Sequence, residues 1–106
     1  MTNFIQLNLT CADKAEADKI AKALLDKHLV ACVRQMPVTS DYRWQGKLEK
    51  SSEILLMMES HEDLFDRVEA EVAKLHSYDT FVLTATPITR ASQKALQWLE
   101  ENLTNE

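Results

Sequence analysis

The stretch DYRWQGKLEKSSEILLMME, residues 41–59, holds the only glycine of this 106-residue chain. Glycine adopts a positive φ without steric cost, so Gln45-Gly46 predicts the tip of a β-hairpin. The second half of the returning arm, ILLMM at 54–58, is apolar at successive positions and not only at alternate ones. This pattern predicts a strand that is buried on both of its faces.

The length of the hairpin predicts how the chain assembles. A returning arm of about 13 residues extends ~43 Å at ~3.3 Å per residue. A compact domain of this size is only ~35 Å across, because its radius of gyration is ~13 Å. The hairpin should therefore bend at Pro37 or project beyond its sheet. A projecting hairpin would expose Tyr42, Trp44 and Leu48, so we expect a homo-oligomer with these side chains in its interface.

The remaining segments complete one predicted domain over residues 1–106. Alternating apolar positions predict a strand over 4–10, and a helical stripe after Asp13 predicts a helix over about 13–28. Proline cannot donate to a β-ladder, so Pro37 indicates a bulge, a bend or an edge strand in the first hairpin arm.

The second half of the chain repeats this alternation of elements. Ser60, with Asp63 three residues on, predicts the N-cap of a second helix. A strand over 80–88 is expected to stop at Pro87, and Ser92 is expected to start a last helix. The order β-α-β-β-α-β plus a C-terminal helix predicts an α+β fold with the ferredoxin-like split βαβ arrangement.

Composition excludes several classes of function. The net charge of −5 argues against a nucleic-acid partner, and the absence of a long apolar run argues against a membrane protein. Cys11 and Cys32 have no CxxC spacing, and residues 1–10 do not show the basic and apolar regions of a signal peptide, so free thiols in a cytoplasmic protein are expected. The chain has no glycine-rich phosphate loop, and its residue spacing suggests no catalytic set, so we do not expect an enzyme.

Several motifs in order along the chain resemble the CutA family of divalent-cation tolerance proteins. They are ACV at 31–33, the run from Thr39 to Met58 containing WQGKLEKSSE, HSYD at 76–79, TPI at 86–88, and LQWLEENL at 96–103. The resemblance implies a ferredoxin-like fold and a homotrimer in which long hairpins pair between subunits. It also implies kinship with the trimeric PII-type signalling proteins, and a link to copper binding and metal tolerance.

The chain departs from the family pattern at the end of the returning hairpin arm and after its second predicted helix. Family members typically read H-P-Y-E-x-P-E-I where this chain has HSYDTFVL at 76–83, and Glu59 stands where the family has a lysine. The resemblance therefore identifies a divergent member with altered cleft chemistry.

The resemblance implies a metal site built from Cys11 and His76, with Asp79 nearby. A thiolate and an imidazole suit Cu(II) or another soft or borderline divalent ion, although no cofactor is required. The alternative is structural, because a buried cysteine often acts as a small hydrophobe and a histidine at a helix C-terminus often acts as a cap.

A second functional hypothesis is a PII-like trimer that binds a small molecule, or a scaffold that organises a partner protein. Trp44, Lys47, Glu53 and Tyr78 would meet in a cleft between subunits, with Lys47 holding an anionic group and the aromatic rings stacking. The alternative is that Trp44 is an interface anchor and Lys47 a charge at the hairpin tip.

Overall fold

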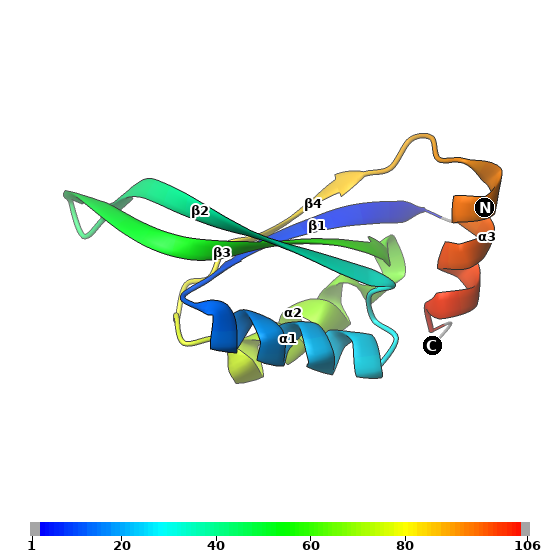
Figure 1. The fold of residues 1–106 in the computed structure, drawn as a ribbon, viewed down its shortest axis with the longest axis horizontal. Coiled ribbons are helices and arrows are strands. Elements are labelled where there is room, and N and C mark those ends of the chain that lie inside the picture. The colour runs from blue at the N-terminus through cyan, green and yellow to red at the C-terminus, as the bar shows by residue number, and fades with distance from the viewer. Residues whose placement is uncertain (1–2, 105–106) are drawn as a thin grey trace.

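The computed structural model describes residues 3–104, so residues 1–2 and 105–106 of the predicted domain lie outside the described part. Figure 1 shows a four-stranded antiparallel sheet with two helices on one face and a third at one end. The strand order is β2-β3-β1-β4, the order of a ferredoxin-like fold, so the predicted fold is confirmed. The elements are β1 (Phe4–Cys11), α1 (Lys14–Asp26), β2 (Cys32–Trp44), β3 (Lys47–His61), a 3-10 turn (Glu62–Leu64), α2 (Phe65–Leu75), β4 (Leu83–Pro87) and α3 (Gln93–Asn102).

The core lies between the sheet and the two helices α1 and α2. Leu56 and Met58 of β3 point toward the helices and have no exposed surface. Leu55 and Met57 point to the opposite side, which we call the open face, and remain half-buried. The expected burial of β3 on both faces is therefore complete on only one face of this chain.

The hairpin of β2 and β3 projects beyond the rest of the sheet, as its length predicts. The strands pair one to one from Cys32↔Glu59 to Trp44↔Lys47, and all residues from 41 to 50 are exposed. The chain measures 44 × 25 × 21 Å, with the hairpin along its longest axis (Figure 1). Gln45 at φ 50° and Gly46 at φ 80° form a turn with two positive φ angles, the signature of a type I′ hairpin.

Pro37 lies in β2, which is an edge strand, and the register continues through it without a bulge. Of the three predicted possibilities, the edge position is therefore the one found. An edge strand has one side without a ladder partner, so the missing N–H of proline is tolerated there.

The predicted Ser60 cap is wrong. Ser60 lies inside β3, is fully buried, and donates its hydroxyl to the carbonyl oxygen of Leu29 at 2.6 Å. The strand continues because β1 pairs with it as far as Phe4↔His61. His61 instead caps the 3-10 turn that precedes α2, because its Nδ1 accepts a hydrogen bond from the Asp63 N–H at 3.0 Å. The N-cap of α2 itself is Leu64, which makes no side-chain cap hydrogen bond.

Two other predicted caps are confirmed. Asp13 accepts a hydrogen bond from the Glu16 N–H at 2.9 Å, and Ser92 accepts one from the Ala95 N–H at 3.3 Å. The last strand is shorter than the predicted range of 80–88, since β4 begins only at Leu83. It ends at Pro87, as predicted. Within residues 3–104, no helix combines the length and the apolar character needed to cross a bilayer.

Candidate functional site

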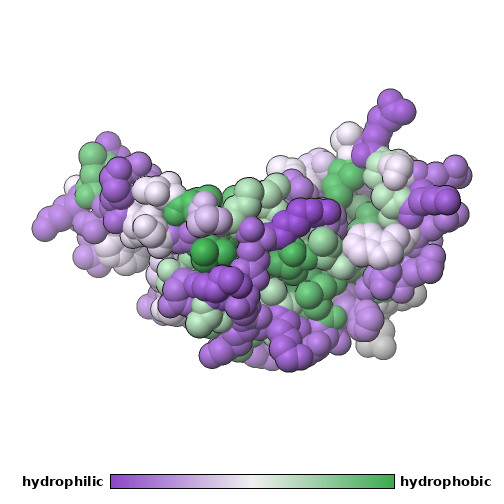
Figure 2. Space-filling view, in the orientation of Figure 1, coloured by the Kyte–Doolittle hydropathy of each residue, from purple (hydrophilic) through white to green (hydrophobic). Residues whose placement is uncertain are grey.

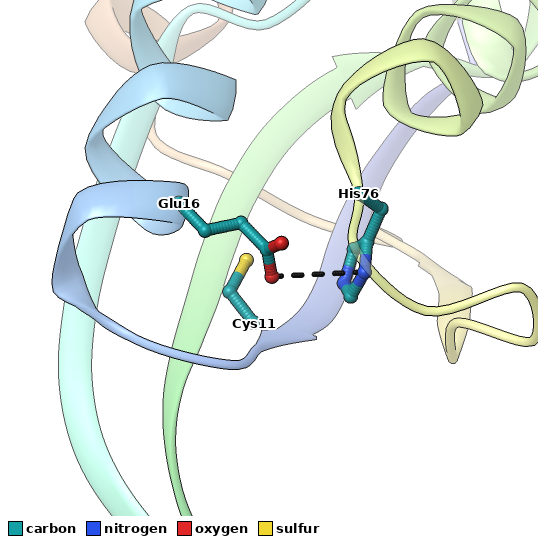
Figure 3. Close-up of side chains that lie close together, drawn as sticks. All are labelled: Cys11, Glu16 and His76. Carbon is teal, nitrogen blue, oxygen red and sulfur yellow. Dashed lines mark ion pairs between the residues drawn. The ribbon is translucent and has the colours of Figure 1, made fainter.

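Three side chains with metal-ligating atoms gather where the ends of three elements meet. Cys11 is the last residue of β1, Glu16 lies in the first turn of α1, and His76 caps the C-terminus of α2. Their ligand atoms all lie within 4.8 Å of one another. Figure 3 shows the three side chains converging on one small volume from these separate segments.

Glu16 holds two distant segments of backbone together. Its Oε2 accepts a hydrogen bond from the Ala12 N–H at 2.8 Å, and its Oε1 accepts one from the Ser77 N–H at 2.7 Å. The side chain is only 10% exposed, so water replaces these bonds poorly. Burial alone would raise the pKa of Glu16, but the hydrogen bonds from Ala12 and Ser77 outweigh it and lower the pKa.

The hydrogen bonds of His76 define its protonation state. Its Nε2 lies 2.8 Å from the carbonyl oxygen of Thr10, which can only accept, so Nε2 carries a proton. Its Nδ1 accepts a hydrogen bond from the Tyr78 N–H at 3.1 Å, so Nδ1 carries none. His76 is therefore neutral, and its fully buried side chain also stacks on Phe81 with ring centroids 5.3 Å apart. His76 is also the C-cap of α2, as the structural alternative predicts.

Cys11 has no exposed surface and stands as a protonated thiol. Burial, followed by the nearby carboxylates of Glu16, Glu53 and Asp13, raises its pKa to about 12. A thiol in this state is a poor nucleophile. It becomes a metal ligand only when a cation supplies the positive charge that displaces its proton.

The structure brings Cys11 and His76 together, as the family resemblance implies, but it does not bring Asp79 to them. Asp79 is exposed in the segment between α2 and β4 and is not a member of the cluster. The third side chain of the group is Glu16 instead. The sequence signals only a local role for Glu16, because it stands three residues after the helix cap Asp13.

The second predicted site is only partly assembled by one chain. Tyr78 donates its hydroxyl to Glu53 Oε2 at 2.9 Å, and Glu53 is 7% exposed. Burial, followed by the hydrogen bond to Glu53, raises the pKa of Tyr78 to about 12. Lys47 and Trp44 pair with each other at the hairpin tip, and Lys47 lies six residues from Glu53 along β3, a distance of ~20 Å.

A hollow of about 460 Å³ lies beside Glu53, between the hairpin and the start of α1. Two carboxylate residues, Asp13 and Glu53, belong to its lining, and the lining has no lysine or arginine. The full lining is Ala12, Asp13, Pro37, Val38, Thr39, Ser52, Glu53 and Ile54.

The three predicted interface residues lie on the projecting part of the hairpin. Tyr42 is 37% exposed, Trp44 50% and Leu48 74%. Figure 2 shows hydrophobic atoms at this end of the molecule among mostly hydrophilic ones. Tyr42 also makes a 2.8 Å hydrogen bond with the hydroxyl of Ser51.

Comparison with known proteins gives one consistent result over almost the whole chain. Residues 5–102 match the model of the family described as CutA1 divalent ion tolerance protein. The chain is 38% identical over 103 residues to the divalent-cation tolerance protein CutA of Archaeoglobus fulgidus, covering 97% of this chain and 99% of that protein. It is 34% identical over 94 residues to Protein CutA of Homo sapiens, covering 88% of this chain and 52% of the longer human protein. The crystal structure of CutA1 from Oryza sativa superposes with a TM-score of 0.95 at 29% identity, covering 99% and 97% of the two chains.

Proposed function

Because the chain belongs to the CutA1 divalent ion tolerance family, we propose that it binds a divalent metal ion and takes part in the response to such ions. The ligands in this proposal are the Cys11 thiolate, the His76 Nδ1 and the Glu16 carboxylate. The observation that carries the proposal is the convergence of these three side chains within 4.8 Å. Copper(II) and zinc(II) are the preferred candidates, since both accept sulfur and imidazole ligands.

The arrangement around the cluster fits a metal in two respects. Ligand atoms bound to one tetrahedral zinc lie about 3.5 Å apart, so the side chains need to move by only about 1 Å. A metal-binding histidine usually donates its other ring N–H to a carbonyl or carboxylate, which fixes its tautomer. The Nε2–H of His76 already donates to the Thr10 carbonyl, so Nδ1 is the nitrogen that could bind a metal in place of the Tyr78 N–H that it now accepts.

Titration with Zn(II) and Cu(II), read by native mass spectrometry and calorimetry, tests the proposal. We expect one ion per chain in the wild type and at least tenfold weaker binding in Cys11→Ser and in His76→Gln. Cys32→Ser is the matched control, since Cys32 lies outside the cluster. Binding of equal strength in the wild type and in both cluster variants would overturn the proposal.

We propose that the functional form is a homotrimer in the cytoplasm and that it is not an enzyme. The open face supports assembly, because Met36 is 42% exposed there and lies opposite the half-buried Leu55. The exposed aromatic side chains of the hairpin support it further. Two free cysteines fit the reducing conditions of the cytoplasm.

A second candidate function is the binding of a small molecule at the hollow beside Glu53, in the manner of the PII-type trimers. Two observations support it. The lining includes the buried acidic residue Glu53, and a hollow of about 460 Å³ has the volume of many ligand sites. In an assembled trimer, Trp44 and Lys47 of a neighbouring hairpin would complete this cleft. A thermal-shift screen of cationic and anionic metabolites tests it, and Glu53→Gln should abolish any shift that is found.

A further inference from the structure

We propose that metal binding at the cluster releases Tyr78 from Glu53, so that the cluster controls the hollow in which Glu53 lies. This inference rests on the proposed metal site and adds a regulatory connection to it. The connection runs through two consecutive backbone N–H groups, those of Ser77 and Tyr78, which bind to two of the proposed metal ligands.

The first step concerns the single lone pair of His76 Nδ1. It now accepts the hydrogen bond of the Tyr78 N–H at 3.1 Å. A neutral imidazole has one acceptor nitrogen, and Nε2 is committed to the Thr10 carbonyl at 2.8 Å. A metal that binds Nδ1 must therefore displace the Tyr78 N–H.

The second step concerns Glu16. Its Oε2 lies 3.6 Å from His76 Nδ1, while its Oε1 holds the Ser77 N–H at 2.7 Å. A carboxylate that turns toward a metal at Nδ1 weakens its bond to Ser77. The metal therefore competes with both of the hydrogen bonds that fix the backbone of residues 77–78.

The third step carries the change to the hollow. The Tyr78 hydroxyl reaches Glu53 Oε2 at 2.9 Å from a residue whose backbone is held by the cluster. Hydrogen bonds weaken steeply when their geometry is lost, so a shift of about 1 Å in the backbone of Tyr78 breaks this contact. Glu53 then keeps a buried carboxylate without this hydrogen bond. Because Glu53 and Asp13 both belong to the lining of the hollow, a cationic ligand such as an amine or a guanidinium is favoured there.

Thermodynamic linkage supplies the test, because a contact that the metal must break opposes metal binding. Removing the contact in Tyr78→Phe should tighten Zn(II) binding by about tenfold, equivalent to about 1.4 kcal/mol. Tyr42→Phe is the matched control. It also removes a tyrosine hydrogen bond, the 2.8 Å contact with the Ser51 hydroxyl, but this bond lies on the hairpin and does not involve the cluster. We expect its Zn(II) affinity to stay within twofold of the wild type.

Amide hydrogen exchange gives a second readout that does not depend on a variant. Saturating Zn(II) should accelerate exchange of the Ser77 and Tyr78 amides by at least tenfold, while most amides of the sheet become slower. Exchange at Asp63, whose N–H binds to His61 away from the cluster, should not accelerate.

The outcomes separate the two proposals. If Zn(II) does not bind, or binds equally to Cys11→Ser, both the metal site and its connection to Tyr78 are refuted. If Zn(II) binds in a Cys11-dependent manner but Tyr78→Phe binds no tighter and the two amides do not accelerate, the metal site stands and the connection is overturned.

Discussion

Glu16→Gln is the substitution that best tests how the cluster is held together. Glutamine keeps the size of the side chain and one accepting oxygen, but it replaces the other oxygen with an NH₂ donor. One of the two N–H groups that Glu16 now binds, from Ala12 or Ser77, would then face a donor. A hydrogen bond to a charged group contributes about 1.5–3 kcal/mol, and a neutral one about 1 kcal/mol. Losing one and neutralising the other should lower the free energy of unfolding by about 2–4 kcal/mol per chain.

The effect of Glu16→Gln should depend on pH in a defined direction. The pKa of Glu16 in the folded chain lies below its ordinary value of 4.5. Its carboxylate therefore contributes in full above that value, and the contribution is lost as pH falls through the lower pKa of the folded state. The difference between wild type and variant should be largest near pH 7 and should shrink toward pH 3.

Denaturant unfolding at several pH values measures this difference. Far-ultraviolet circular dichroism follows the transition, and the protein concentration is kept constant because the stability of the proposed oligomer would depend on it. Glu69→Gln, at an exposed position of α2, is the control and should change stability by no more than about 0.5 kcal/mol. A Glu16→Gln effect below about 1 kcal/mol at pH 7, or one that is equal at pH 3, would refute the assigned role of these hydrogen bonds.

Other predictions concern the thiol, the turn and the assembly. Cys11 should resist iodoacetamide at pH 8 in the folded protein and react after unfolding in guanidinium, because burial raises its pKa to about 12. Peptide mass mapping measures the labelling, and rapid labelling of Cys11 in the folded protein would contradict this prediction. Gln45→Asn should stabilise the protein by about 0.5–1 kcal/mol and Gly46→Ala should destabilise it by about 1 kcal/mol, since both positions have a positive φ. Thermal unfolding measures both changes in stability, and changes of the opposite sign would exclude backbone strain as the cause. Trp44→Ala should weaken the proposed trimer in sedimentation experiments, while Trp98→Ala on α3 should not. An assembly of unchanged stability in Trp44→Ala would show that Trp44 is not an interface anchor.

Features that depend on a few neighbouring residues could be predicted from the sequence. The caps Asp13 and Ser92 each bind an N–H three residues away, and the Gln45-Gly46 turn depends on the φ angles of two residues. Ser60 shows the limit of this reasoning. Its spacing to Asp63 fits a helix cap, but pairing of β1 with β3 extends the strand past it.

The candidate site could be predicted only in part, for the same physical reason. Cys11 and His76 were recognisable by their chemistry and by resemblance to a family, but Glu16 was not. Its bond to Ser77 spans 61 residues of sequence, and no local pattern indicates where a long side chain will reach. The apolar pattern of β3 predicts burial on both faces, but only one face is fully buried in the single chain, where Leu55 and Met57 remain half-buried.

The distance in sequence between the halves of the cluster also determines when the cluster can form. His76 binds Thr10 across 66 residues, so the site exists only after one of the longest loops in the chain has closed. Such contacts are costly in chain entropy and tend to form late in folding. An ion that requires the closed site therefore cannot guide the early steps of folding. A bound ion would act afterwards, by slowing the unfolding of the folded chain. During synthesis on a ribosome it would have no site to bind until the second helix has emerged.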